Sequence, residues 1–121
     1  MAGTEPRPTD IKVNRAAKTL EIIFDDGVGF VLPAEYLRVE SPSAEVQGHG
    51  PGQKILVAGR RHVGIADIQT VGNYAIRIIF DDLHDTGIFS WRYLYKLGTE
   101  FKTRWEKYLE ALESAGLHRD P

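Results

Sequence analysis

Paired acidic residues follow the same apolar run at two places in the chain. The pentapeptide IIFDD occupies Ile22–Asp26 and again Ile78–Asp82. Paired carboxylates serve acid–base catalysis and sites for hard cations. Neighbouring residues of a strand point to opposite faces, so two adjacent aspartates converge on one atom only if the chain turns between them. Because Asp is also a favoured turn residue, we interpret both pairs as strand ends leading into turns, with catalysis or metal binding as the alternative.

A histidine distinguishes the second copy of the pentapeptide. His84 lies between Asp82 and Asp85, and a nearby carboxylate can fix the tautomer of an imidazole or raise its pKa. His49, in the glycine-rich stretch QGHGPGQ, is a second histidine that could approach it. These four residues form a candidate site for a weak divalent metal or a small ligand. A small enzyme that uses a His–Asp pair stays open as a further alternative.

The composition narrows the functional classes. The chain has 121 residues, a formal net charge of −2 and no cysteine. So weak a charge argues against nucleic acid or an anionic membrane as the partner. The lack of cysteine excludes disulfides, iron–sulfur ligation and cysteine nucleophiles. Because no apolar run has the length of a membrane span or a signal peptide, we expect a cytoplasmic protein that binds neither nucleic acid nor membrane and holds no cofactor.

The hydrophobic pattern predicts an α+β fold, with a mostly antiparallel set of about six to eight short strands. Gly- and Asp-containing turns join several of them into hairpins. A long loop follows at residues 41–53, which hold two prolines and three glycines. The predicted strands lie at residues 11–13, 18–24, 28–32, 54–59, 63–72, 74–80 and 88–90.

Three helical segments are also predicted. Pro33 opens a helical turn, and Ser90 caps a second segment at 91–97. Thr99 caps the last helix, which is amphipathic and ends at Gly116. Its apolar face, from which we expect Trp105 and Leu109 to face the sheet, consists of Phe101, Trp105, Tyr108, Leu109 and Leu112.

The length indicates a single domain. We expect it to cover residues 10–116, with flexible tails at 1–9 and 117–121. Both copies of IIFDD have the same context: a strand, an Asp–Asp turn, a short strand and a helical turn that ends in Tyr-Leu. The pattern therefore predicts two similar units within the domain.

The stretch LRVESPSAEVQGHG, followed by VGNYAIRIIFDDLHDTGIFSWRYLYKL, resembles the small N-terminal domain of gamma-butyrobetaine hydroxylase and its relatives, over residues 10–98. That family includes stand-alone bacterial proteins of unknown function, and a similar module is attached to iron–sulfur carriers of the Mrp type. In the hydroxylases, the iron and 2-oxoglutarate belong to a separate, larger domain. The resemblance therefore implies an accessory fold and no catalysis for this chain.

The resemblance also implies a zinc site that this chain has lost. The hydroxylase domain holds a structural zinc through three cysteines and one later histidine, and the matching positions here are Ser41, Ser43, Val46 and His84. Serine hydroxyls are poor replacements for thiolates on zinc. We expect no zinc here, and a loop held by turn hydrogen bonds and side-chain packing.

These observations favour a non-catalytic binding or adaptor module that acts through a protein partner. The resemblance suggests iron–sulfur cluster or metalloenzyme maturation as its setting. Trp91, which precedes Tyr93 and Tyr95 in the second predicted helix, is a candidate for contact with the partner. The alternative is the metal or ligand site centred on His84.

Overall fold

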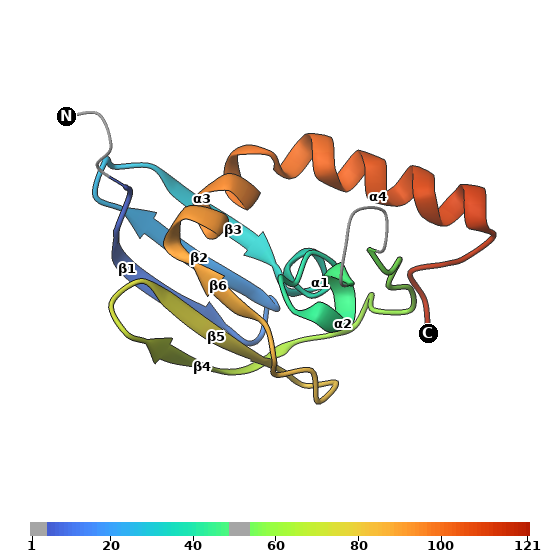
Figure 1. Ribbon diagram of the computed structural model, residues 1–121, viewed down its shortest axis with the longest axis horizontal. Coiled ribbons are helices and arrows are strands. Elements are labelled where there is room, and N and C mark those ends of the chain that lie inside the picture. The colour runs from blue at the N-terminus through green and yellow to red at the C-terminus, as the bar shows by residue number, and fades with distance from the viewer. Residues whose placement is uncertain (1–4, 49–53) are drawn as a thin grey trace.

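The computed structural model describes residues 5–48 and 54–121. Within them the chain forms two antiparallel sheets of three strands each, together with four helices (Figure 1). The predicted α+β fold is confirmed, and its strands divide into two small sheets. Along the chain the elements are β1 (Pro8–Asn14), β2 (Thr19–Phe24), β3 (Gly29–Pro33), α1 (Ala34–Val39), α2 (Ala44–Gln47), β4 (Ile65–Val71), β5 (Ala75–Phe80), β6 (Ile88–Ser90), α3 (Trp91–Thr99) and α4 (Phe101–Ala115).

The predicted internal repeat is confirmed by the order of the elements. The first sheet has the order β1-β2-β3 and leads into α1, and the second has the order β4-β5-β6 and leads into α3. Even the irregularities agree: the register of β1 shifts opposite Phe24, at the end of β2, and that of β4 shifts opposite Phe80, at the end of β5. The chain therefore contains two β-β-β-α units.

The two units exchange contacts through their helices. Tyr36 of α1 donates a hydrogen bond from its hydroxyl to the carbonyl oxygen of Leu97 in α3 (2.7 Å). Tyr93 of α3 donates to the carbonyl oxygen of Glu40, directly after α1 (2.5 Å). Burial raises the pKa of both phenols, that of Tyr93 to about 12. Equivalent residues thus make reciprocal bonds, as in two halves related by an approximate two-fold axis.

One hydrophobic core lies between the two units. Alternate residues of β2 point inward, so Leu20, Ile22 and Phe24 are buried. On β5, Ile76, Ile78 and Phe80 do the same. Leucines of both helices complete this core, namely Leu37, Leu94 and Leu97.

The last helix packs only partly as the sequence predicts, because Trp105 packs against the main core whereas Leu109 does not. α4 extends away from the sheets, over α1 and the irregular segment that follows residue 54 (Figure 1). Its buried residues Tyr108 and Leu112 form a second small core with Val39 of α1. Leu109 is 38% exposed, so its predicted contact with the sheet is wrong.

The caps of the helices follow the sequence with one exception. Gly116 ends α4 in the left-handed conformation, with φ 68°, and the Ser90 hydroxyl accepts the Tyr93 N–H at the start of α3. Thr99 does not cap α4, because α3 includes this residue and its hydroxyl donates back to the carbonyl oxygen of Lys96 (3.1 Å).

The strand predicted at residues 54–59 is absent, because this segment pairs with neither sheet and packs against α4 instead. Residues near the C-terminus hold it in place. The N–H groups of Gly59 and Arg61 donate to the carbonyl oxygens of His118 and Arg119, both at 2.9 Å. Arg119 also binds both carboxylate oxygens of Glu35, at 2.7 and 2.9 Å. These contacts involve residues for which the sequence predicts a flexible tail.

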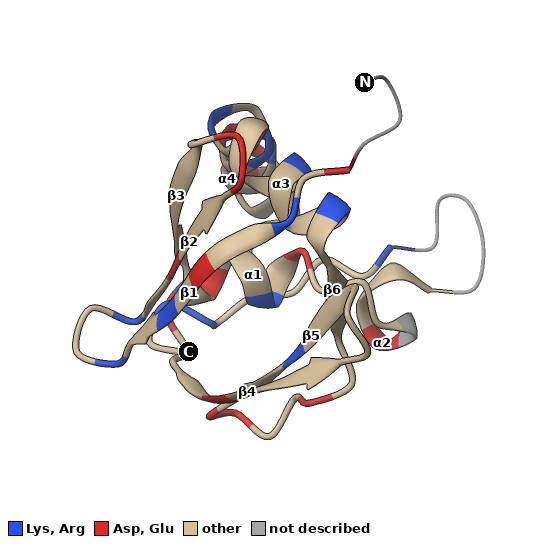
Figure 2. Ribbon diagram, turned by 90° about the vertical axis from the view of Figure 1, so that its left-hand side faces the viewer, with Lys and Arg blue, Asp and Glu red and all other residues tan. Residues whose placement is uncertain are grey.

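Charged residues of both signs are interspersed over the elements (Figure 2). This distribution agrees with the net charge of −2. Within residues 5–48 and 54–121, no helix is both long and apolar enough to cross a lipid bilayer.

Candidate functional site

The first aspartate of each pair fastens the start of a neighbouring strand. An Oδ1 atom of Asp25 accepts the N–H of Arg7 (3.3 Å), and the Asp25 N–H donates to the Arg7 carbonyl oxygen (2.8 Å). Asp81 repeats both bonds with Gly64, at 2.9 and 3.0 Å. These carboxylates are therefore used in equivalent positions to stabilise the two sheets.

The second aspartate of each pair shapes the turn itself. Asp26 accepts the N–H of Val28 (2.9 Å), and Asp82 accepts the N–H of His84 (3.2 Å), two residues further on in both cases. Such bonds close Asx turns. The interpretation of both Asp–Asp pairs as strand ends leading into turns is thus confirmed.

The remaining oxygen of each second aspartate reaches the opposite unit. Asp26 accepts from the Tyr95 hydroxyl (2.7 Å), a bond that lowers the pKa of Asp26. Asp82 lies 2.8 Å from Nε of Arg38 and 2.9 Å from Nε of Arg60. Burial alone would raise the pKa of Asp82, but the Arg38 hydrogen bond and the two positive charges outweigh it and lower that pKa. The Asp82 carboxylate is thus engaged by arginines.

The two turns diverge after the second aspartate. Gly27 follows Asp26 with φ 85°, and Leu83 follows Asp82 with φ 73°. Glycine adopts this left-handed conformation freely, whereas leucine adopts it at a cost. The Leu83 side chain is 90% exposed, so packing within the chain does not offset that cost.

His84 is buried in a cluster of hydroxyl groups. Its Nε2 lies 3.0 Å from Oγ of Ser41 and 3.3 Å from Oγ of Ser43, and the two hydroxyl oxygens are 3.4 Å apart. Gly87 closes the cluster, because a Cβ atom there would lie 2.3 Å from the Ser41 Oγ. The structure therefore brings together Ser41, Ser43 and His84, the polar positions that the resemblance identifies.

The carboxylate beside the imidazole is not the one expected from the sequence. Nδ1 of His84 lies 3.3 Å from Oε2 of Glu45. Asp82, in contrast, accepts a hydrogen bond from the backbone N–H of His84 and not from its imidazole, and Asp85 is exposed. The histidine side chain is only 2% exposed, and its Nδ1 makes no hydrogen bond within the described residues. Sequence reasoning missed Glu45, although it is the sole carboxylate of the predicted loop at 41–53. The structure forms the short helix α2 within that segment, and Glu45 belongs to it.

The charge on His84 is disfavoured by its surroundings. Burial and the positive charge of Arg38 lower its pKa, and the carboxylates of Glu45 and Asp82 only partly oppose this. The ring is therefore neutral near pH 7, with one nitrogen available as an acceptor.

The side chains present do not fit zinc. The third cysteine position is Val46, a hydrocarbon side chain buried in the interior, and Ser41 and Ser43 offer hydroxyls where zinc prefers thiolates. Among residues 5–48 and 54–121, no group of three or more His, Cys, Asp or Glu side chains could hold a metal ion. His49 lies outside the described residues.

Trp91 is not part of the His84 cluster. Its indole N–H donates to the carbonyl oxygen of Asn73 (2.8 Å), just before β5, whereas His84 follows the other end of that strand. Trp91 instead lines a separate surface hollow with Tyr74 and Arg92.

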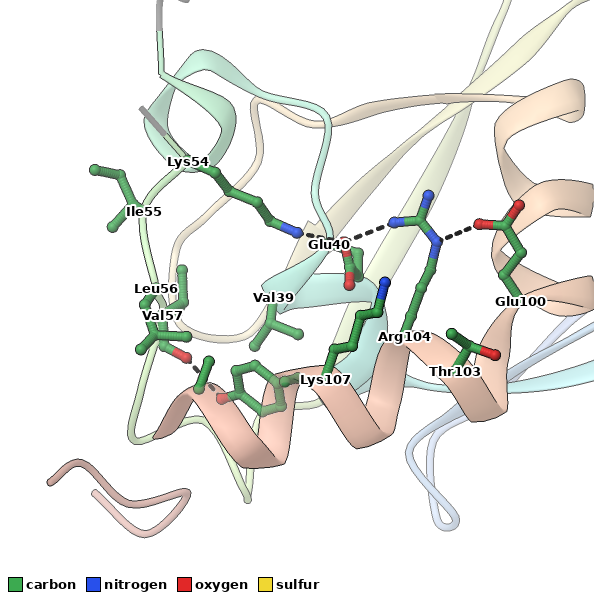
Figure 3. Close-up of a pocket in the computed structure, with 12 residues that line it drawn as sticks. Val39, Glu40, Lys54, Ile55, Leu56, Val57, Glu100, Thr103, Arg104 and Lys107 are labelled. Carbon is green, nitrogen blue, oxygen red and sulfur yellow. Dashed lines mark hydrogen bonds and ion pairs between the residues drawn. The ribbon is translucent and has the colours of Figure 1, made fainter. Parts of the chain in front are cut away.

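A groove of about 580 Å³ lies between α4 and residues 54–57 (Figure 3). Sequence reasoning missed it, because it joins segments far apart in the chain. Ile55, 51% exposed, lies at its edge. Its apolar lining consists of Val39, Ile55, Leu56, Val57, Tyr108 and Ala111.

One side of this groove is charged. Glu40, whose side chain is largely buried, binds Nζ of Lys54 (2.7 Å) and a guanidinium nitrogen of Arg104 (3.1 Å). Arg104 also binds Glu100 (2.8 Å). Figure 3 shows Lys107 directed across the groove toward Glu40. The arrangement combines an apolar floor with a wall of alternating charges, a combination typical of binding surfaces.

Comparisons with known proteins agree with the resemblance seen in the sequence. The family model described as gamma-butyrobetaine hydroxylase-like, N-terminal, matches residues 11–95. Two structures determined by NMR in solution are each 45% identical to this chain with a TM-score of 0.85; one covers 98% of this chain and 93% of its own, the other 100% and 90%.

A further similar structure has a bacterial source. It is the crystal structure of a protein of unknown function from the DUF971 family of Acidithiobacillus ferrooxidans ATCC 23270, which is 35% identical with a TM-score of 0.64. The match covers 76% of this chain and 92% of that one. No curated protein matches the chain at a significant level. On the family model and these structures, the chain belongs to the gamma-butyrobetaine hydroxylase-like N-terminal domain family, of unknown function.

Proposed function

We propose that this protein is a non-catalytic binding module that engages a protein partner through the groove between α4 and residues 54–57. The supporting observation is the groove itself, with its apolar floor, its charged wall and the exposed Ile55 at its edge. Apolar surface that is rimmed by charges is characteristic of sites that bind other proteins. The aspartates of the repeated pentapeptide, by contrast, are used in turns and ion pairs within the fold.

The setting that we propose is the maturation of an iron–sulfur or other metalloprotein. The support is the family resemblance, since similar modules are attached to iron–sulfur carriers and to an iron-dependent hydroxylase. With no cysteine in the chain, the module would assist a partner that holds the metal and would not hold a cluster itself.

Two matched substitutions on α4 test the use of the groove. Ala111→Arg places a long charged side chain in the groove, whereas Ala115→Arg makes the same chemical change at an exposed position outside it. Arginine is a good helix former, so α4 is retained in both. Tagged wild type and both variants are expressed in the source cells, crosslinked and recovered, and the proteins bound to each are quantified by mass spectrometry.

The proposal predicts a partner that wild type and Ala115→Arg retain and Ala111→Arg loses. Circular dichroism and thermal unfolding of the three forms establish that both variants are folded. A set of bound proteins that is the same for all three forms, or that is empty for wild type, would refute the use of this groove.

A second candidate function is a weak site for a divalent cation at His84. The observation that favours it is the buried Nδ1, which lies 3.3 Å from the Glu45 carboxylate and makes no hydrogen bond among residues 5–48 and 54–121. Imidazole and carboxylate together suit such cations. Titration of Mn²⁺ into isotopically labelled protein should broaden the signals of His84 and Glu45, and Glu45→Gln should weaken the effect. Signals near His84 that stay unchanged up to millimolar metal would eliminate this function.

A further inference from the structure

The segment that forms one wall of the groove resembles a strand, although it pairs with neither of the two sheets. KILVAG, residues 54–59, has the composition of a strand but joins neither sheet. Its inward hydrogen bonds come from alternate residues. The Ile55 N–H donates to Val46 (2.6 Å), the Val57 carbonyl oxygen accepts from the Tyr108 hydroxyl (2.6 Å), and the Gly59 N–H donates to His118 (2.9 Å). This alternation is that of an extended chain bonded along one side.

Leu56 therefore directs its backbone groups to the other side of the segment. Within the part of the chain that the structure describes, neither its N–H nor its carbonyl oxygen has a hydrogen-bond partner. An unpaired strand edge is what an extended peptide pairs with when it adds to a folded domain.

The charges of the groove favour an acidic occupant. Three cations line it, Lys54, Arg104 and Lys107, against the two carboxylates of Glu40 and Glu100. Glu40 is shared by Lys54 and Arg104, so the excess positive charge lies with Lys107, which forms no ion pair among the described residues. A second copy of this chain would bring the same basic edge against itself, so charge disfavours self-association here.

We infer that the groove takes an extended, acidic segment of a partner protein. This segment pairs with the backbone of Leu56, places an apolar side chain on the floor beside Tyr108, and places a carboxylate beside Lys107. The inference rests on the proposed function and adds to it the chemistry of the partner.

Selection from a random peptide library tests this inference with a defined probe. Twelve-residue peptides are selected on wild type, with Ala111→Arg as the counter-selection. This length gives about three turns of helix or a strand of about 40 Å, so a peptide can bind in either conformation. The peptides that bind are resynthesised. Each is measured against wild type, Lys107→Glu and Lys102→Glu, the last being a matched charge reversal on α4 outside the groove. Each peptide is also made with methyl groups on alternate backbone nitrogens. This change removes the N–H groups with which a strand would pair and leaves the side chains unchanged.

The inference predicts peptides with an apolar and an acidic residue close together. Lys107→Glu and N-methylation should each weaken their binding at least about tenfold, and Lys102→Glu by less than about twofold. Basic peptides, peptides with apolar residues at helical spacing, unchanged affinity after N-methylation, or no enrichment would overturn it. If Ala111→Arg still loses the cellular partner, these results would refute only the inference about the chemistry of the partner. If Ala111→Arg retains that partner, the proposed function itself is refuted.

Discussion

The two Asp–Asp turns begin alike and end differently. In both, the first aspartate fastens a neighbouring strand and the second closes the turn on the backbone N–H two residues later. The first turn then continues with Gly27 and the partly exposed Val28. The second has Leu83 in a costly conformation and the buried His84 at the equivalent places. A repeated sequence thus fixes the same turn twice, while the residues just beyond the repeat create a new polar cluster in one unit only.

A second difference between the units lies at the ends of their helices. The carbonyl oxygens of Glu40 and Leu97 accept equivalent tyrosine hydroxyls, yet Leu97 is buried in the core and Glu40 brings a charge to the groove. Both candidate sites therefore lie where the second unit departs from the first.

Alanine substitution of the equivalent residues His84 and Val28 tests the comparison between the two turns. Of the tests proposed for it, this one has the largest expected effect on stability. His84→Ala should lower the free energy of unfolding by about 2–4 kcal/mol, because it leaves a cavity and removes the hydrogen-bond partner of two buried hydroxyls. Val28→Ala, at a position 37% exposed, should cost less than about 1 kcal/mol. Urea unfolding measures both. Equal costs would mean that His84 is no more important to its turn than Val28.

The reciprocal tyrosines provide the next test. Tyr36→Phe and Tyr93→Phe each leave a carbonyl oxygen without its hydrogen bond, and should each cost about 1–3 kcal/mol. Tyr95→Phe, which removes a hydroxyl at the surface, is the control and should have a smaller effect. If neither variant differs from the control, the exchange of contacts between the units does not stabilise the fold.

Each turn has one residue in the left-handed conformation, Gly27 or Leu83, and substitutions there should have smaller effects on stability. Gly27→Ala should cost about 1 kcal/mol, because its φ of 85° is unfavourable for a residue with a Cβ. Leu83→Gly should be neutral or gain up to about 1 kcal/mol, since it relieves the same strain at the expense of more disorder in the unfolded chain. Thermal unfolding measures both, and a clear loss of stability in Leu83→Gly would show that the exposed leucine contributes to folding.

The pH dependence of stability should show the smallest effect. The folded chain lowers the pKa of His84 below the ordinary value of 6.5, so the unfolded chain binds the proton first as the pH falls. Stability should therefore be complete above pH 6.5 and decline below it. Urea unfolding of wild type between pH 7.5 and 5.5 should show this decline, and His84→Asn should show less of it. A stability that rises on acidification would contradict the assigned neutral ring.

Local sequence signals predict much of this fold. The alternation of apolar residues predicts the strands of both units, and Ser90 and Gly116 predict helix ends. The repeated pentapeptide predicts the internal repeat. These features depend on residues close together in the chain, because the backbone preference of each residue and the spacing of apolar side chains determine strands and helix ends locally.

Features that depend on contacts between residues far apart in the chain could not be predicted from these local signals. Residues 54–59 have strand composition but pair with no strand in the part of the chain that the structure describes. Leu109 lies on an apolar helix face that is broader than the surface it covers. The family resemblance identifies the histidine cluster, but Glu45 at Nδ1 of His84 becomes visible only once the loop is folded. The groove is formed by α4 and residues 54–57, which only the tertiary structure brings together.

The affinity of a recovered partner for wild type, Ala111→Arg and Ala115→Arg, measured by isothermal titration calorimetry on purified proteins, tests the role of the groove most directly. The proposed function predicts that Ala111→Arg binds at least about tenfold more weakly than wild type, while Ala115→Arg stays within about twofold. Equal affinity of all three proteins would contradict it, and would show that the groove beside α4 is not where this module binds.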